Sequence, residues 1–298
     1  MRIVGRTKSL IHYHFIVFIF GFTSILGALI SIDALYLVWL RMFIAAVSLG
    51  FFIVSTNRKA FLIQSKNRLQ IFIAGFLISL HWVTFFKAIK MIGISPTLAM
   101  LSSGALMTAI LEPFFYKRKF LIYELLCGVI ALVGMIIIFY SSPKDWWGMI
   151  VALLATFLGV LFTLINGKLI NKNSPSAITF YEMFIGFLLI SVYLISFELS
   201  NYDFISITLF DWIWLTLLGT LCTAYAITGS VAVMKELNPY TIMLVINMEP
   251  IYGIILALII FGEDELMNAR FYLGLVIILF AIISNSLIKF QNHNFKNK

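Results

Sequence analysis

Long apolar runs, separated by short polar connectors, follow one another along nearly the whole chain. An α-helix needs about 20 consecutive apolar residues to cross the hydrocarbon core of a bilayer. The chain is 62% hydrophobic and only 11% charged, a composition that a soluble domain of this length does not need. The sequence therefore predicts an all-α integral membrane protein.

The runs predict ten transmembrane helices, at approximately residues 12–30, 34–55, 69–91, 96–116, 121–140, 147–168, 176–198, 210–233, 238–262 and 269–289. The first run follows Arg2, Arg6 and Lys8, as in a signal peptide, but it is as long as a membrane span and has no clear small-x-small cleavage site. We therefore expect it to remain as the first helix.

The basic residues lie mostly in connectors on one side of this topology. With the N-terminus inside, most of the 21 Lys and Arg residues are inside, and the connectors on the other side carry Lys90, Lys144 and Arg270. Positive residues concentrate in cytoplasmic loops. We expect a multi-pass protein of the bacterial inner membrane with both termini in the cytoplasm, and we attribute the net charge of +8 to topology, not to a nucleic-acid partner.

The two halves of the chain resemble each other. GALI at Gly27–Ile30 recurs as GKLI at Gly167–Ile170, and MFIA at Met42–Ala45 recurs as MFIG at Met183–Gly186. The common spacing predicts two repeats of five spans each, over residues 1–142 and 143–298. Because five is odd, the second repeat enters the membrane from the opposite side, as in transporters that work by alternating access.

The run from Asn238 to Gly262 carries Asn247, Glu249 and Pro250 near its centre. A carboxyl group at that depth is costly, and a proline removes a backbone hydrogen bond. We therefore expect Glu249 and Asn247 to bind substrate and Pro250 to serve gating. The structural alternative is a kinked helix whose acid is protonated or paired with another helix.

This plan resembles the drug/metabolite transporter superfamily, and specifically its EamA-type ten-span members. The resemblance rests on the repeats, on WLR at Trp39–Arg41, and on the run NPYTIMLVINMEPIYGIILALIIFGE at Asn238–Glu263. In the first repeat, Glu112-Pro113 lies nearer the end of its span than the family pattern has it. The resemblance implies export or exchange of small metabolites, such as amino acids, through a cavity between the repeats.

Further candidates lie in other spans. His81 and Trp82 near the centre of one span, Tyr225 at the position equivalent to His81, and Asn166 are candidate substrate-binding residues. Aromatic rings can hold cationic or aromatic ligands. The alternative for His81 is a satisfied hydrogen-bonding group inside the bundle, and the alternative for Trp82 and Asn166 is helix packing. Arg41 and Glu182 both precede the repeated MFI, but their predicted depths differ, so we expect each to have a local partner and a gating or structural role.

The sequence contains no phosphate-binding glycine loop, HExxH, CxxC or nucleophile elbow. We therefore expect no enzyme, catalytic residue, metal or cofactor. The expected partners are a small-molecule substrate, membrane lipids and, as a candidate coupling ion, the proton. A lipid flippase and a non-transporting scaffold or receptor subunit are the alternative functions.

Overall fold

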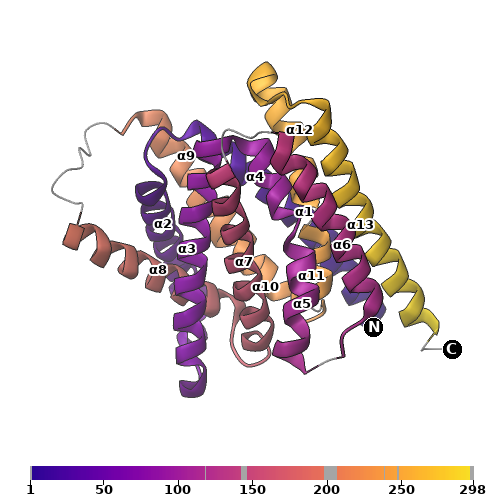
Figure 1. Cartoon of the computed structure of the whole chain (residues 1–298). Coiled ribbons are helices and arrows are strands. Elements are labelled where there is room, and N and C mark those ends of the chain that lie inside the picture. The colour runs from indigo at the N-terminus through magenta and orange to yellow at the C-terminus, as the bar shows by residue number, and fades with distance from the viewer. Residues whose placement is uncertain are drawn as a thin grey trace.

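The computed structural model describes residues 2–117, 119–141, 146–197, 207–237, 239–246 and 248–295, and these residues form helices and connecting turns without a strand (Figure 1). The helices are α1 (Arg2–Leu29), α2 (Ala34–Thr56), α3 (Arg68–Ile92), α4 (Ile94–Leu101), α5 (Gly104–Tyr116), α6 (Ile122–Ser141), α7 (Trp146–Leu169), α8 (Pro175–Phe197), α9 (Leu209–Gly219), α10 (Ala226–Val233), α11 (Pro239–Ile246), α12 (Met248–Phe261) and α13 (Ala269–Phe295), with the short helices η1 (Arg58–Phe61), η2 (Ser65–Asn67), η6 (Thr220–Tyr225) and η7 (Gly262–Glu265). Each predicted span coincides with one helix or with consecutive helical segments.

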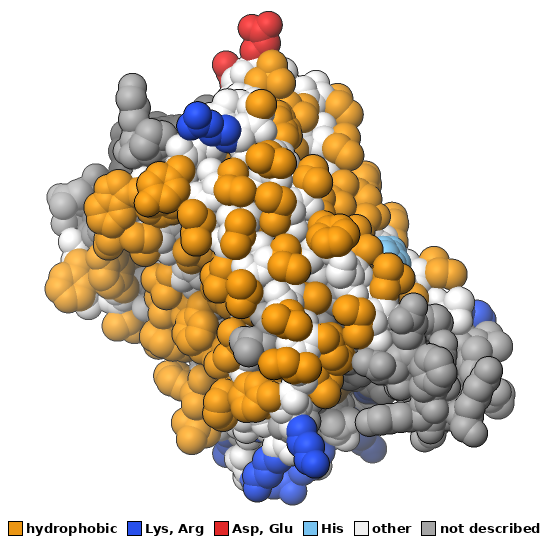
Figure 2. All heavy atoms as spheres, turned by 45° about the vertical axis from the view of Figure 1, so that its right-hand side comes forward, with side chains coloured by type: hydrophobic (Ala, Val, Ile, Leu, Met, Phe, Trp, Pro, Cys, Tyr) orange, Lys and Arg blue, Asp and Glu red, His pale blue; other side chains and the backbone are white. Residues whose placement is uncertain are grey.

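The helices are long and apolar enough for a membrane. Among the described residues, eight stretches have the length and hydropathy to cross a bilayer, and Ala269–Ala281 of α13 is a shorter apolar segment. Large hydrophobic side chains such as Phe51 and Leu273 lie on the surface, and they cover most of the face in Figure 2, with Lys and Arg mainly at one end and Asp and Glu at the other. Such a surface suits lipid rather than water, so this is a multi-pass membrane protein.

Two of the predicted spans are interrupted. The span predicted over residues 96–116 divides into α4 and α5 at Ser102 and Ser103. The described residues of the span over 238–262 belong to α11 and α12. The first break needs no proline, because the Ser103 hydroxyl donates to the Met100 carbonyl oxygen at 2.7 Å and competes with the helical ladder. The second interruption is η6, a π-helix between α9 and α10.

The two halves of the chain pack against each other along most of their length. α3 contacts α7 and α8, α1 contacts α12 and α10, α2 contacts α8 and α9, and α6 lies along α13. The crossing of α6 and α13 is close because it is made by glycines: a Cβ atom on Gly134 would lie 2.7 Å from the Gly274 carbonyl oxygen, and one on Gly274 would lie 2.6 Å from that of Gly134. Small residues allow helix backbones to approach in this way in membranes.

Two carboxylates hold the connectors together at one end of the bundle. Asp211 accepts hydrogen bonds from the Ser31 backbone N–H at 2.7 Å and the Ser31 hydroxyl at 2.8 Å. Glu265 accepts from the backbone N–H groups of Ile94 and Ser95 at 2.8 and 2.9 Å, and so satisfies the first donors of α4. The start of α1 and the end of α13 lie together at the opposite end (Figure 1).

Candidate functional site

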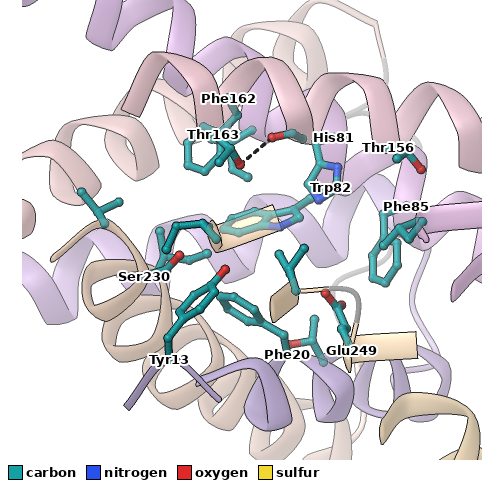
Figure 3. A pocket seen from close by; sticks show the side chains of 18 of the residues that line it. Tyr13, Phe20, His81, Trp82, Phe85, Thr156, Phe162, Thr163, Ser230 and Glu249 are labelled. Atoms are coloured by element: carbon teal, nitrogen blue, oxygen red, sulfur yellow. Dashed lines mark hydrogen bonds between the residues drawn. The ribbon is translucent and has the colours of Figure 1, made fainter. Parts of the chain in front are cut away.

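A central cavity lies between the two halves of the chain (Figure 3). Its volume is about 110 Å³, enough for several water molecules, since one needs about 10–15 Å³. Helices α1, α2, α3 and α4 line it from the first half, and α7, α10, α11 and α12 from the second. The lining residues are Tyr13, Phe20, Thr23, Arg41, Ile78, His81, Trp82, Phe85, Leu101, Thr156, Gly159, Phe162, Thr163, Ile227, Ser230, Val231, Met234, Ile242, Ile246, Glu249 and Pro250.

Arg41 supplies a positive charge to this cavity. Its side chain is 1% exposed, and its guanidinium carbon lies 3.7 Å from the centroid of the Trp82 ring, within cation–π range. Its Nε donates to the Thr223 hydroxyl oxygen at 2.6 Å, while Nη1 is buried without a hydrogen-bond partner among the described residues. A buried guanidinium N–H without a partner is costly, so this atom is available to an anionic ligand.

The π-helix η6 places the residue that holds Arg41. Thr223 lies within it, and its hydroxyl donates to the carbonyl oxygen of Leu218, five residues earlier, at 2.6 Å. With its proton given to Leu218, the hydroxyl oxygen is left to accept from Arg41. Short π-helical turns occur often at functional sites.

Glu249 supplies an acid to the same cavity. It lies in the first turn of α12, is 8% exposed, and is followed by Pro250, which also lines the cavity. Figure 3 shows Glu249, Phe20 and Tyr13 on one side of the cavity and Trp82 and His81 on the other. A carboxyl and a guanidinium thus share one enclosed and otherwise mainly apolar space.

His81 presents a nitrogen to the cavity. Its Nδ1 donates to the Ala155 carbonyl oxygen at 2.7 Å, because a carbonyl oxygen can only accept. In the neutral imidazole, Nε2 is then a hydrogen-bond acceptor. Gly159 permits this position, since a Cβ atom there would lie 3.1 Å from the ring.

The predicted site residues fall into three groups. The cavity brings together Glu249, Trp82, His81, Arg41 and Pro250. Its lining does not include the other described candidates, which are Tyr225, Asn166 and Glu182. Asn247 lies outside the described residues.

Tyr225 lies away from the cavity. Its side chain is 43% exposed, and its hydroxyl lies 2.9 Å from the His12 Nε2. The repeat alignment pairs it with His81, but His81 lies in a regular α-helix and Tyr225 ends a π-helix. Because a π-helix advances less per residue around its axis than an α-helix, Tyr225 points in a different direction from its counterpart.

The sequence interpretation missed several lining residues. Tyr13 is fully buried with its hydroxyl near Ser230, and Phe20 and Phe85 supply further aromatic walls. Tyr13 stands between two histidines near the start of the first span. A hydroxyl-bearing ring inside a predicted membrane helix is the signal that could have found it, but nothing in the sequence shows which way the ring faces.

Comparison with known proteins agrees with this architecture. The sequence model described as "EamA-like transporter family" matches twice, over residues 10–140 and 146–287. The chain belongs to the EamA-like transporter family. This places it in the drug/metabolite transporter superfamily, whose members of the EamA type are small-molecule transporters.

Among solved structures, a protein described only as "Crystal structure of protein" is similar, with a TM-score of 0.68 and 11% identity over 95% of this chain and 96% of that one. At that identity the likeness concerns the fold alone. No curated protein matches the chain.

Proposed function

We propose that this EamA-like protein is a secondary transporter that exports small metabolites, such as amino acids or related compounds, by alternating access through the central cavity. The observation that carries the proposal is the presence of Arg41 and Glu249 together in the lining of one cavity between the two halves of the chain. Binding sites for small molecules are typically apolar pockets with a few placed polar groups.

The cavity has the chemistry to hold a small zwitterion. The unpartnered Nη1 of Arg41 suits a carboxylate, because guanidinium N–H groups form strong, directed hydrogen bonds to carboxylate oxygens. Glu249 is the matching group for an amine. Phe20, Phe85 and Phe162 offer apolar walls for the rest of the molecule.

Equivalent packing in the two halves supports an inverted repeat. A Cβ atom on Gly75 would lie 3.0 Å from the Glu182 carbonyl oxygen and 3.0 Å from Ile185, and one on Gly219 would lie 3.3 Å from the Arg41 carbonyl oxygen and 2.6 Å from Ile44. Each contact is thus repeated with the halves exchanged. The equivalence of Arg41 with Glu182 in this packing agrees with their equivalence in sequence.

The proposal includes ten spans, with both termini in the cytoplasm of a bacterial inner membrane. The start of α1 and the end of α13 lie at the same end of the bundle (Figure 1), which fits an even number of membrane crossings. We further propose that Glu249 couples transport to protons, since a buried carboxyl between two sides of a membrane can take a proton from one and release it to the other.

A thermal-shift screen of the purified protein tests the substrate class, because a ligand that binds the folded state stabilises it. We expect small amino acids or related zwitterions to raise the melting temperature, and Arg41→Gln to abolish the rise. Amides of the same compounds, which lack the carboxylate, serve as matched ligands. If acid and amide stabilise the wild type and Arg41→Gln equally, Arg41 does not bind the ligand.

A further inference from the structure

A second group of buried polar side chains lies outside the central cavity. Glu182, Asn166 and Thr179 are each 0% exposed, and none of them lines the cavity. Among the described residues, neither carboxyl oxygen of Glu182, neither amide atom of Asn166 and not the hydroxyl of Thr179 has a hydrogen-bond partner. Buried polar groups are rarely left in this state without a ligand, a proton or a water.

Asn166 on α7 interacts with Glu182 on α8, and Thr179 lies one turn before Glu182 on α8. The Asn166 amide on α7 lies close enough to the Glu182 carboxyl to interact with it, although not with the geometry of a standard hydrogen bond. Thr179 precedes Glu182 by three residues on α8, and residues with this spacing share a helix face. Thr156 and Thr163 on α7 bond to carbonyl oxygens of their own helix, whereas Thr179 leaves its hydroxyl free for another partner.

The chemistry of the group favours a small cation with one positive charge. Glu182 offers two oxygens, Asn166 one and Thr179 one, and hard cations bind to oxygen ligands of this kind. A single buried carboxylate needs a single positive charge to become neutral, and leaving it uncompensated is costly. A monovalent cation therefore fits the group better than a divalent one.

Among the described residues, no cation from the neighbouring helices is assigned to this place. On α7, Lys168 is exposed and lies over the rings of Phe115 and Tyr116. α8 packs against α2, α3, α10 and η1. Arg41 on α2 is bonded to Thr223 and stacked on Trp82, and His81 on α3 is bonded to Ala155. The remaining charged groups on these elements are Arg68, Lys87 and Lys90 on α3 and Arg58 and Lys59 on η1; of these, Lys90 donates to the Ile30 carbonyl oxygen, and the other four are exposed.

We propose that Glu182, Asn166 and Thr179 form a second binding site, separate from the central cavity, for a monovalent cation, H⁺ or Na⁺. Because Arg41 and Glu182 are equivalent in the two repeats, an exchange of conformation between the repeats would bring Glu182 toward the cavity, where the cation can leave. This last step rests on the proposed function, whereas binding of the cation does not.

The test uses purified protein without substrate, so its result is independent of transport. The melting temperature is measured as Na⁺ replaces choline at constant ionic strength, and separately as a function of pH in choline. We expect the wild type to be stabilised by Na⁺ if the site takes sodium, or by falling pH if it takes a proton. Because Glu249 is a second buried acid, the pH series is measured in the Glu249→Gln background. There Glu182→Gln should lose the dependence, and the exposed-acid control Glu263→Gln should keep it.

Asn166→Leu should raise the cation concentration that gives half of the stabilisation by about tenfold or more, because it removes one ligand to a charged group. If Glu182→Gln folds and responds to Na⁺ and pH as the wild type does, the site is overturned. If that variant does not fold, carbodiimide labelling of the wild type, followed by mass spectrometry, decides. Labelling of Glu182 that slows with Na⁺, or that slows at a clearly higher pH than labelling of the exposed Glu263, supports the site. Labelling that ignores Na⁺ and follows the same pH course as that of Glu263 refutes it.

Discussion

Arg41 and Trp82 form a stacked pair at the wall of the central cavity, with the guanidinium carbon 3.7 Å from the centroid of the indole ring. The two residues come from different helices of the first repeat, and Thr223 of the second repeat holds the arginine by its Nε. The charge of the cavity therefore depends on a contact between the repeats. A movement of one repeat against the other would change the position of this charge.

The first prediction concerns Thr223→Val, which keeps the shape of the side chain and removes the oxygen that accepts from Arg41. We expect the affinity for the metabolite found by thermal shift to fall about tenfold, as for other lost hydrogen bonds to charged groups, measured by calorimetric titration. Thr220→Val is the matched control, because Thr220 lies in the same π-helix and its hydroxyl donates to the Thr216 carbonyl oxygen of its own helix. Unchanged affinity in Thr223→Val would show that Arg41 does not need this anchor.

The second prediction separates two aromatic residues that the repeat alignment places at neighbouring positions. Trp82→Ala should weaken metabolite binding by about 0.5–2 kcal/mol, the range of a cation–π contact, with expression nearly intact. Tyr225→Ala should leave binding unchanged, because Tyr225 lies outside the cavity lining. Equal losses of folded protein and of binding in Trp82→Ala would instead assign the indole to packing.

The third prediction tests proton coupling at Glu249. Glu249→Gln keeps the shape and removes the exchangeable charge, so reconstituted protein should lose its dependence on a pH gradient while exchange at equal pH partly survives. The measurement is uptake into proteoliposomes with and without an imposed gradient, with Glu263→Gln as the control for loss of an exposed acid. A wild type whose transport ignores the gradient would exclude the coupling role.

The fourth prediction concerns the crossing of α6 and α13. Gly134→Ala would place a Cβ atom 2.7 Å from the Gly274 carbonyl oxygen, and overpacking of this kind typically costs about 1–3 kcal/mol. We expect a lower melting temperature for Gly134→Ala and for Gly274→Ala. Gly5→Ala is the control, since a Cβ atom there meets nothing within 4 Å. Unchanged melting temperatures in both variants would contradict the close approach of α6 and α13.

The fifth prediction is that both termini are cytoplasmic, as the positive-inside rule indicates. A fluorescent reporter fused to the C-terminus should fluoresce, and alkaline phosphatase fused there should be inactive. Fusions of the same two reporters after Phe197 should give the opposite result, because the connector that follows is predicted to lie outside. An active phosphatase at the C-terminus would contradict both the topology and the inverted repeat.

The sequence by itself determined the class of the protein and its main chemical groups. Hydropathy is summed along the chain, so apolar runs could be recognised as membrane helices without knowledge of their neighbours. Glu249, Arg41 and Trp82 were recognisable because charges and large polar rings are rare and costly inside such runs. The equivalence of Arg41 and Glu182 also followed from the sequence, through the repeated MFI.

The tertiary structure alone decided which of these groups face one cavity. The direction of a side chain depends on the rotation of its helix and on the neighbour it packs against, and these are properties of pairs of helices, not of a run of residues. Tyr225 turns away because a π-helix changes the rotation before it, and the break at Ser103 comes from a local hydroxyl bond. For the same reason Arg41 meets the cavity while Glu182 is buried beside Asn166, although the sequence gives the two residues equivalent positions.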